Sequence, residues 1–374
     1  MLGRPRTGAA QADLNDALAL LAGLFAGARY ESLAPPHIFP ADTLLDVYGE
    51  DLRARAFIFA DAGRGNELCL RPDFTGPVAL SHAQAGWDRK AAYAYQGPVF
   101  RNQPQGLGRP VEYTQAGIER FGDQDTVAAD AAVFVLLRRG LAALGIGRPR
   151  ATIGDLSIPF AALDALDMPA RRRAALHRHF WRPVRFQALL TRAQTDIEIR
   201  PDLEGAADVD RAATMMAEAG EPVGLRTPED IAERVALLAA EAAEPRMPAR
   251  DAQVIAQLLS VSGPATKAAD SLRRIVEPAG LDIDAAIVRY QDRLAAIEEE
   301  GIPLDDLTFD AAFGRNLEYY DGFVFEMRPR GRADHPPLSG GGRYDAMTVK
   351  LGAERPIPAV GGMIRPEAVL EARR

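Results

Sequence analysis

Cysteine and lysine are both scarce in this sequence. Among the 374 residues, cysteine occurs once, as Cys69, and lysine only three times. A single cysteine excludes an internal disulfide and a cysteine-built zinc site, so we expect a reducing, cytoplasmic location. With so little lysine, Schiff-base chemistry and lysine phosphate clamps have few candidates, and anion recognition would fall to arginine. Cys69 stands between two leucines and is interpreted as a small packing residue.

Long apolar runs and an excess of positive charge are also missing. No segment reaches the roughly 18 uncharged apolar residues of a membrane-spanning helix, and we expect neither export nor membrane insertion. The 52 acidic and 44 basic residues give a net charge of −8, so no general field attracts nucleic acid. The apolar fraction of 47% is that of a packed globular protein. Membranes and nucleic acid are therefore not expected partners.

Sequence motifs for nucleotide and metal binding are lacking as well. The sequence has no Gly-x-x-x-x-Gly-Lys-Ser/Thr run and no Gly-x-Gly-x-x-Gly that opens a helix, which leaves P-loop and dinucleotide-binding folds without support. His177 and His179 are two residues apart, a poor spacing for shared metal ligation on a helix. We expect no cofactor and no metal.

Hydrophobic spacing predicts an antiparallel α+β core in residues 1–150. Strands follow one another and helices come late, an order that favours an antiparallel sheet over a doubly wound parallel one. The glycine-containing segment between the first two strands is typical of a hairpin turn. In chain order, the predicted elements are a helix over 13–29, a hairpin of strands 56–59 and 67–71, a strand pair at 93–101 and 111–121, and a helix over 126–144.

Residues 151–304 have a different texture, rich in alanine, arginine, glutamate and leucine at helical spacing. Prolines and a glycine interrupt this pattern, which predicts a mostly helical insertion. Strand-like composition returns at 316–327 and 358–364. We therefore expect residues 305–374 to complete the domain that residues 1–150 begin.

Four segments combine arginine, carboxylate, glutamine and tyrosine within strand-like sequence, where burying a polar group is costly unless it is satisfied. Gln115 and Glu119 are four residues apart, so an extended strand directs both to one face, where an amide and a carboxylate suit an ammonium group. Taken singly, such a pair is more often a satisfied structural network, and Gly340–Gly342 is more often a turn than a phosphate cradle. The four segments are 70–75, 97–101 with 112–119, 313–322 and 339–345.

The order of these segments resembles the class II aminoacyl-tRNA synthetase core of the histidyl type. The resemblance covers about 10–145 and 305–366, and it implies an α+β fold: an antiparallel sheet flanked by helices, with a helical insertion. The region of Pro36 is a looser match to the first class II motif. Phe100–Arg101, Gly108–Arg109 and Glu112–Gln115 match the second motif, and Arg315–Tyr320 and Gly341–Asp345 match the two histidine-specific segments.

The resemblance implies a pocket for free histidine. Physical chemistry agrees, because a zwitterion needs acidic groups at one end and guanidinium at the other, and an imidazole needs a hydrogen-bond partner and an aromatic or apolar wall. The implied residues are Asp73, Thr75, Gln115 and Glu119 for the α-ammonium group, Arg101 and Arg315 for the carboxylate, and Tyr320 and Tyr344, together with Glu119, for the imidazole.

Departures from the synthetase pattern argue against catalysis. The arginine that clamps the ATP γ-phosphate in the third motif is replaced by Ala368, and Arg365 lies three residues earlier, before a proline. In the second motif the usual Arg-Tyr-Glu-Arg becomes Arg101–Pro104, and a further arginine becomes Val111. Each lost donor could cost on the order of 10²–10³ in rate, so we expect no synthetase activity.

The chain stops shortly after the third motif, so we expect no anticodon-binding domain. A histidine pocket without an ATP clamp resembles the regulatory subunits of ATP phosphoribosyltransferase. In that family the subunit joins a short catalytic subunit, activates it and confers feedback inhibition by histidine at the head of histidine biosynthesis. The resemblance implies a hetero-oligomer built around a homodimer, with free L-histidine as effector.

Two other functions remain open at this point. One is an enzyme that adenylates histidine or a related amino acid for a non-tRNA acceptor, and the other is a dimeric interaction protein with a vestigial pocket. The arginine-rich segment 171–185 could contact RNA, although its helical spacing favours a solvated helix face or a subunit contact.

Overall fold

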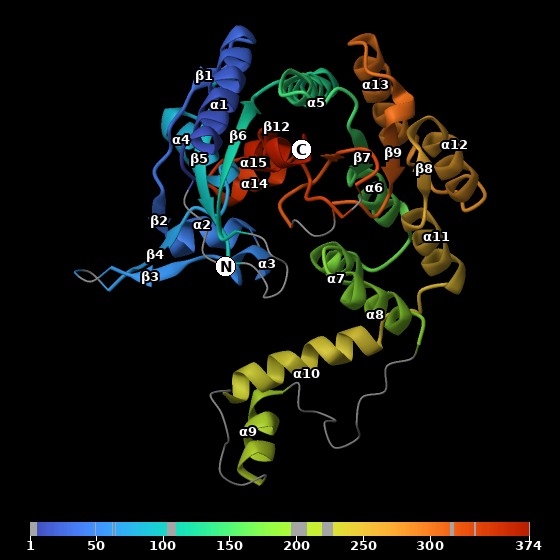
Figure 1. The fold of residues 1–374 in the computed structure, drawn as a ribbon. Helices are drawn as coiled ribbons and strands as arrows, with labels where there is room; N and C mark the ends of the chain where they lie inside the picture. Colours follow the sequence, from blue (N-terminus) through green and yellow to red (C-terminus); the bar gives the residue numbers. More distant parts are fainter. Residues whose placement is uncertain are drawn as a thin grey trace. The chain divides into compact units, whose positions relative to one another are not determined.

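A computed structural model gives the fold of the chain. It divides into two compact units, one formed by Met1–Ala165 with Gln257–Arg374 and the other by Leu166–Ala256. Figure 1 shows the elements of both along the chain. The structure describes residues 6–48, 50–61, 63, 65–102, 110–195, 208–218, 227–314, 318–332 and 334–373.

The first unit is built on a large mixed sheet. Within the described residues, nine strands pair in the order β1-β5-β6-β12-β11-β10-β7-β9-β8. Neighbouring strands are antiparallel except for the parallel pairs β1–β5 and β7–β9, which confirms the predicted antiparallel α+β class. In sheet order the strands are β1 (Glu31–Ser32), β5 (Ala91–Phe100), β6 (Glu112–Phe121), β12 (Ala359–Ile364), β11 (Ser339–Arg343), β10 (Phe323–Arg328), β7 (Arg150–Asp155), β9 (Leu307–Asp310) and β8 (Ser262–Pro264).

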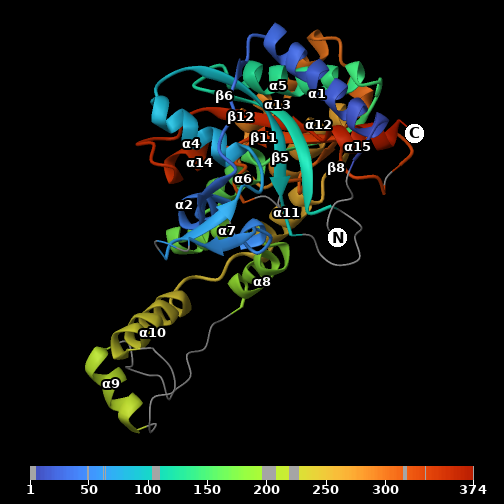
Figure 2. The same cartoon turned by 60° about the vertical axis from the view of Figure 1, so that its left-hand side comes forward.

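Helices α1 (Ala9–Gly27), α5 (Thr126–Ala143) and α13 (Asp284–Glu299) lie along one face of this sheet, as Figure 2 shows. Leu14, Leu21 and Phe25 recur at helical spacing and are buried in α1, so the amphipathic pattern correctly predicted this helix. The Asp125 carboxylate accepts a hydrogen bond from the Ala128 amide at 2.9 Å and caps α5, which satisfies one otherwise unpaired donor of the first turn. Both predicted helices are confirmed.

The predicted hairpin forms, but in a separate sheet. Strands β3 (Ile58–Ala60) and β4 (Glu67–Leu70) pair antiparallel, and β2 (Ile38–Pro40) joins the other edge of β4. These strands form an antiparallel sheet of their own in the order β2-β4-β3, so the hairpin does not belong to the sheet that contains β5 and β6. Helix α2 (Ala41–Tyr48) packs against this small sheet, and α4 (Thr75–Ala85) packs against α2.

The predicted helical insertion contains two strands of the large sheet. β7 lies between β10 and β9, and β8 forms the edge next to β9. Helices α6 (Ser157–Ala165) and α12 (Ala265–Val276) also belong to the first unit. Residues 151–304 are thus mostly helical, as predicted, while the compact unit inside them is the shorter Leu166–Ala256.

The second unit is helical and holds the arginine-rich segment. Arg171 donates to Glu244 at 2.8 Å, and Arg172 lies 3.2 Å from the same carboxylate. Arg173 donates to the backbone carbonyl of Leu166 at 3.0 Å. These contacts favour a structural role for the segment over an RNA-binding patch. The helices of this unit are α7 (Ala170–His179), α8 (Pro183–Ala193), α9 (Val209–Glu218) and α10 (Pro228–Ala242), with α11 (Ala249–Leu259) crossing its boundary.

Cys69 is fully buried in β4, and burial raises the pKa of its thiol to about 11. A thiol held protonated at neutral pH is a poor nucleophile, so the packing interpretation of this residue fits its environment. None of the helices described is both long enough and apolar enough to cross a bilayer. The same residues include no group of three His, Cys, Asp or Glu side chains placed to hold a metal ion.

Candidate functional site

A cavity of about 380 Å³ opens on the sheet face opposite α5. A Cβ at Gly362 would lie 2.8 Å from Leu137 of α5, so Gly362 faces that helix and its neighbour Met363 faces the cavity. Five of the eight predicted site residues line this cavity: Asp73, Thr75, Arg101, Gln115 and Tyr320. Other wall residues include Tyr319 and Ser339, which lie in two of the four predicted segments, and Tyr95, Glu326 and Met363, which the sequence did not single out.

Strand β6 brings Gln115 and Glu119 to one face, as their spacing predicted. Gln115 pairs in register with Gly97 of β5, and Glu119 pairs with Gly361 of β12. A Cβ on Gly361 would lie 1.5 Å from a Glu119 carboxylate oxygen. Glycine is therefore required at Gly361, because the Glu119 carboxylate lies across the neighbouring strand at this point.

Glu119 is a fully buried carboxyl surrounded by hydroxyl groups. It accepts hydrogen bonds from Thr75 at 3.0 Å, Tyr95 at 3.3 Å and Tyr344 at 2.5 Å. Glu119 and Tyr344 lie behind the cavity wall and connect to it through Thr75 and Tyr95. Burial raises the pKa of Glu119 to about 8, although the three hydroxyl donors oppose that rise and Asp73 adds to it. A cation that enters the cavity would favour the ionised form.

Asp73 and Arg101 place opposite charges side by side. The Arg101 guanidinium lies 3.5 Å from the Asp73 carboxylate and donates to the Pro72 carbonyl at 2.7 Å. Tyr48 of α2 donates to the other Asp73 oxygen and accepts from the Gly76 amide at 2.8 Å. Burial raises the pKa of Asp73, and Arg101 opposes that shift. The cavity thus offers an acid and a guanidinium within reach of one zwitterion.

Two tyrosines form an aromatic wall. The rings of Tyr319 and Tyr320 lie 4.4 Å apart between centroids, and both side chains are buried. A Cβ at Gly342 would lie 2.9 Å from the Tyr320 ring, so this glycine lets the ring rest on β11. Burial raises the pKa of both phenols, which remain neutral hydrogen-bonding groups. Arg315, Gly108 and Arg109 lie outside the described residues.

One polar atom on the cavity face of the sheet has no hydrogen-bond partner among the described residues. It is the side-chain oxygen of Gln115, a residue that is 1% exposed and lines the cavity. A buried polar atom without a partner costs about 1–3 kcal/mol, and a small ligand in the cavity could satisfy it. The Ser339 hydroxyl also has no partner among these residues, but Ser339 pairs in register with Ile364, whose side chain faces α5 on the other side of the sheet.

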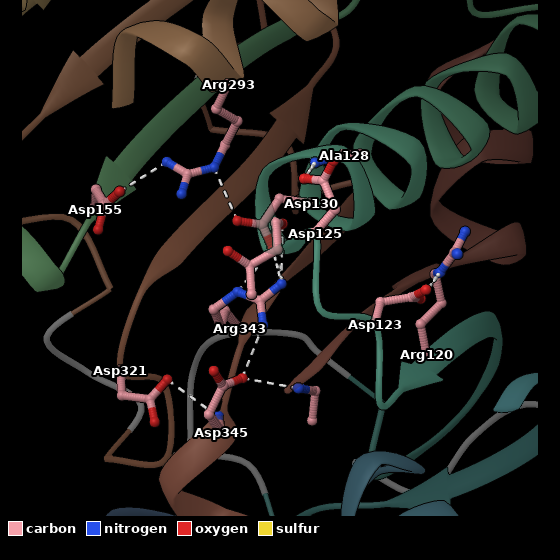
Figure 3. Close-up of polar contacts among 12 residues, drawn as sticks. Arg120, Asp123, Asp125, Ala128, Asp130, Asp155, Arg293, Asp321, Arg343 and Asp345 are labelled. Atoms are coloured by element: carbon pink, nitrogen blue, oxygen red, sulfur yellow. Dashed lines mark hydrogen bonds and ion pairs between the residues drawn. The ribbon is translucent and has the colours of Figure 1, made fainter. Parts of the chain in front are cut away.

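Tyr344 is held in place by a buried chain of alternating charges, drawn in Figure 3. Arg343, at the end of β11, donates to Asp130 at 2.6 Å and to Asp345 at 2.9 Å. Arg293 of α13 donates to Asp130 at 2.8 Å and to Asp155 of β7 at 2.7 Å. These ion pairs tie two helices to two strands and fix the position of the residue that donates to Glu119.

Arg365 and Ala368 lie at the start of the last helix of the described chain. Ala368 lies within helix α15 (Pro366–Ala372), and Arg365 precedes that helix and lines the cavity. The Arg365 guanidinium donates to the Pro337 carbonyl at 2.9 Å and lies 5.9 Å from the centre of the Tyr113 ring. Arg365 therefore reaches the cavity wall, where these contacts hold it.

The sequence matches proteins of one family along most of its length. A family model described as histidyl-tRNA synthetase matches residues 8–240 and 229–369. A protein of Mesorhizobium japonicum named ATP phosphoribosyltransferase regulatory subunit is 38% identical over 93% of this chain and 96% of its own length. One of the same name from Agrobacterium fabrum is 37% identical over 90% of this chain and 91% of its own.

Solved structures show the same fold. A Bacillus halodurans protein described as an ATP phosphoribosyltransferase regulatory subunit/histidyl-tRNA synthetase aligns with a TM-score of 0.70 at 22% identity, covering 100% of this chain and 82% of that one. A histidine–tRNA ligase subunit from Alicyclobacillus acidocaldarius aligns with a TM-score of 0.58 at 25% identity, covering 100% and 98%. The chain belongs to the family of ATP phosphoribosyltransferase regulatory subunits, whose fold is that of histidyl-tRNA synthetase.

Proposed function

We propose that this chain is the non-catalytic regulatory subunit of an ATP phosphoribosyltransferase and that it senses free L-histidine in the cavity. The observation that carries this proposal is the buried Glu119 carboxyl, which has three hydroxyl donors and lies beside a cavity whose Gln115 oxygen has no partner among the described residues. Such an acidic, partly unsatisfied wall suits an ammonium group, while Arg101 supplies the cation that a carboxylate needs.

The proposed pose follows the charges of the wall. The α-ammonium group of histidine lies toward Asp73, Thr75 and Gln115, with Glu119 behind Thr75 as the buried counter-charge. Its carboxylate lies toward Arg101, and toward Arg315 by the resemblance to synthetases. Its imidazole packs on the tyrosine wall near Tyr320. Tyr344 supports the pose by its hydrogen bond to Glu119.

Absence of synthetase activity is part of the proposal. Ala368 cannot clamp a γ-phosphate, and the Arg365 guanidinium is engaged with the Pro337 carbonyl. Activation of a carboxylate by ATP depends on preorganised positive charge at the phosphates. Histidine-dependent exchange of label between ATP and pyrophosphate tests this point. We expect none, and exchange at synthetase-like rates would support the adenylating enzyme instead.

The proposed partner is a short catalytic subunit, assembled with a homodimer of this chain. Histidine can inhibit only if it binds one quaternary state better than another, and a coupling of about 1–3 kcal/mol is typical of allosteric proteins. Mixing the chain with a short-form ATP phosphoribosyltransferase tests this role. We expect activity to rise on mixing and histidine to inhibit the mixture.

Two variants connect that assay to the cavity. Glu119→Ala and Arg315→Ala should each weaken inhibition by histidine, whereas Arg139→Gln should not. Arg139 is a matched control because it pairs with Glu300 at 2.7 Å on the surface, with both side chains about half exposed. Histidine sensitivity that is unchanged in both pocket variants would refute the pocket assignment. Failure of histidine to bind even with the partner present would favour a vestigial pocket.

A further inference from the structure

A second cavity, of about 540 Å³, lies near the histidine cavity on the same sheet face. Its wall includes Arg150 and Thr152 of β7, Arg328 of β10, and the following Pro329–Gly331. Thr152 pairs in register with Glu326, and Glu326 lines the first cavity. Residues in register on neighbouring strands share a face, so the two cavities are neighbours on one surface of the first unit.

The sheet places two arginines directly opposite each other in this second cavity. Arg150 and Arg328 are register partners in the antiparallel pair β7–β10. Like charges at such positions destabilise a sheet unless something compensates them. Arg328 donates to Glu326 at 2.6 Å, whereas Arg150 donates to the Thr308 hydroxyl at 3.3 Å. The Arg150 charge is therefore the less compensated of the two.

More guanidinium groups gather around a buried carboxylate beside this cavity. Asp306 accepts hydrogen bonds from Arg138, from Arg148 at 2.9 Å, and from Arg330. Arg138 is buried, but the side chains of Arg148 and Arg330 are 64% and 52% exposed. Asp305 is a second acidic group near Arg148. Arginines thus outnumber carboxylates here, on a protein whose net charge is −8.

We propose that this arginine cleft, lined by Arg150, Thr152, Arg328 and Arg330 with Arg148 at its edge, binds a phosphate-bearing small molecule. Planar guanidinium groups present paired donors that match phosphate oxygens, and the Thr152 hydroxyl adds a donor of a second kind. A cleft lined by one sign of charge concentrates counter-ions. The bound anion would supply a negative charge opposite Arg150, whose register partner Arg328 is already paired with Glu326.

The arginine cleft is separate from the pocket proposed for histidine. The Glu326–Arg328 ion pair stands between the two cavities, with Glu326 on the wall of one and Arg328 on the wall of the other. This proposal goes beyond the proposed function and does not require it. A titration without histidine tests the cleft alone, so failure of either proposal leaves the other standing.

Calorimetric titration of pyrophosphate into the full chain tests the cleft. We expect saturable binding at constant ionic strength, weakened about tenfold or more in Arg150→Gln, because a charge-assisted, paired hydrogen bond is lost. Arg150→Gln leaves every partner of Asp306 in place, so the fold should persist, and thermal unfolding checks that it does. The control Arg139→Gln removes a surface arginine of the same unit outside the cleft and should bind pyrophosphate as the wild type does.

Three results would overturn the proposal. The first is no saturable binding up to about 10 mM pyrophosphate, a level beyond which an affinity has little meaning for a small ligand. The second is equal affinity in Arg150→Gln and the wild type. The third is binding of a polyglutamate peptide without binding of pyrophosphate, which would assign the arginines to an acidic protein surface instead.

Discussion

Two buried polar clusters of the first unit are built in opposite ways. In the chain Asp155–Arg293–Asp130–Arg343–Asp345, each carboxylate meets a guanidinium at 2.6–2.9 Å. Beside the cavity, the hydrogen bonds that Glu119 accepts from described residues come from hydroxyl groups, and the side-chain oxygen of Gln115 has no partner in the described part of the chain.

The difference separates a structural cluster from a binding cluster. Buried charges that are matched by the protein itself hold elements together and leave nothing for a ligand to add. Buried polar groups that lack a protein partner can instead form hydrogen bonds or ion pairs with a ligand when it binds. The predictions below test whether the first cluster serves stability and the second serves binding.

Removal of the central carboxylate of the charge chain should have the largest effect. Asp130→Ala leaves Arg293 and Arg343 buried without their shared partner, so we expect the free energy of unfolding to fall by about 3–5 kcal/mol. Chemical denaturation measures this change. Glu300→Ala, which breaks the exposed pair with Arg139, is the control and should cost no more than about 1 kcal/mol. Equal losses of unfolding free energy in the two variants would show that the charge chain stabilises the fold no more than an exposed ion pair does.

Neutralising the buried acid of the cavity should affect binding instead. Glu119→Gln removes the counter-charge for the ammonium group, and we expect histidine affinity to fall about a hundredfold, as for loss of a buried charged hydrogen bond. The fold should persist because glutamine can still accept from the hydroxyl groups. A variant that unfolds like Asp130→Ala would show that Glu119 belongs with the structural charges.

The buried acid of the cavity should also make stability depend on pH. Because the folded-state pKa of Glu119 is raised to about 8 from an ordinary 4.5, the folded chain keeps a proton that the unfolded chain releases between these values. The free energy of unfolding contributed by this group therefore falls as pH rises from about 4.5 to about 8. We therefore expect the difference in free energy of unfolding between the wild type and Glu119→Gln to fall across this range when denaturation is measured at several pH values. A difference that is flat across the window would contradict the burial argument.

A smaller effect is expected at the unpaired amide. Gln115→Leu should weaken histidine binding about tenfold, because a polar contact to a charged ligand is lost. It should leave the free energy of unfolding nearly unchanged, since the Gln115 oxygen has no partner among the described residues. Calorimetry and denaturation of the same preparation give both values. A large loss of stability would show that the amide already has a structural role.

The smallest effect is expected for Arg365. Its guanidinium is held by the Pro337 carbonyl at the cavity wall, and the proposed pose directs the ligand carboxylate to Arg101 and Arg315 instead. Arg365→Gln should therefore change histidine affinity less than about threefold, because no charged contact with the ligand is lost. A loss as great as that of Glu119→Gln would move the carboxylate subsite toward this arginine.

Local sequence patterns predicted α1, α5 and β6. Gln115 and Glu119 share a face because β6 continues unbroken through both, and the buried residues of α1 recur at helical spacing. Periodicity did not show β7, a short strand embedded in a helical stretch. It also did not show that the hairpin of β3 and β4 leaves the main sheet, since sheet membership depends on pairing between distant segments.

The wall of the cavity was predicted in part. The resemblance to the histidyl synthetase core predicted Asp73, Thr75, Arg101, Gln115 and Tyr320, which line one cavity, whereas the predicted Glu119 and Tyr344 lie one layer behind it. Tyr48, Asp130 and Arg293 carry no local signal, because their partners are distant in sequence. Tyr95 pairs in register with Gly117, a combination that could have been sought in the sequence. An aromatic residue opposite a glycine on the next strand marks where a ring lies across a sheet.

The central claim is that the buried Glu119 carboxyl beside the cavity serves to bind free histidine. Calorimetric titration of L-histidine into the chain mixed with its catalytic partner, in parallel for wild type and Glu119→Gln, tests this claim most directly. The account predicts saturable binding heat for the wild type. For the variant it predicts a dissociation constant roughly a hundredfold higher, because one buried charged contact is lost. Equal isotherms, or no binding by the wild type, would contradict it.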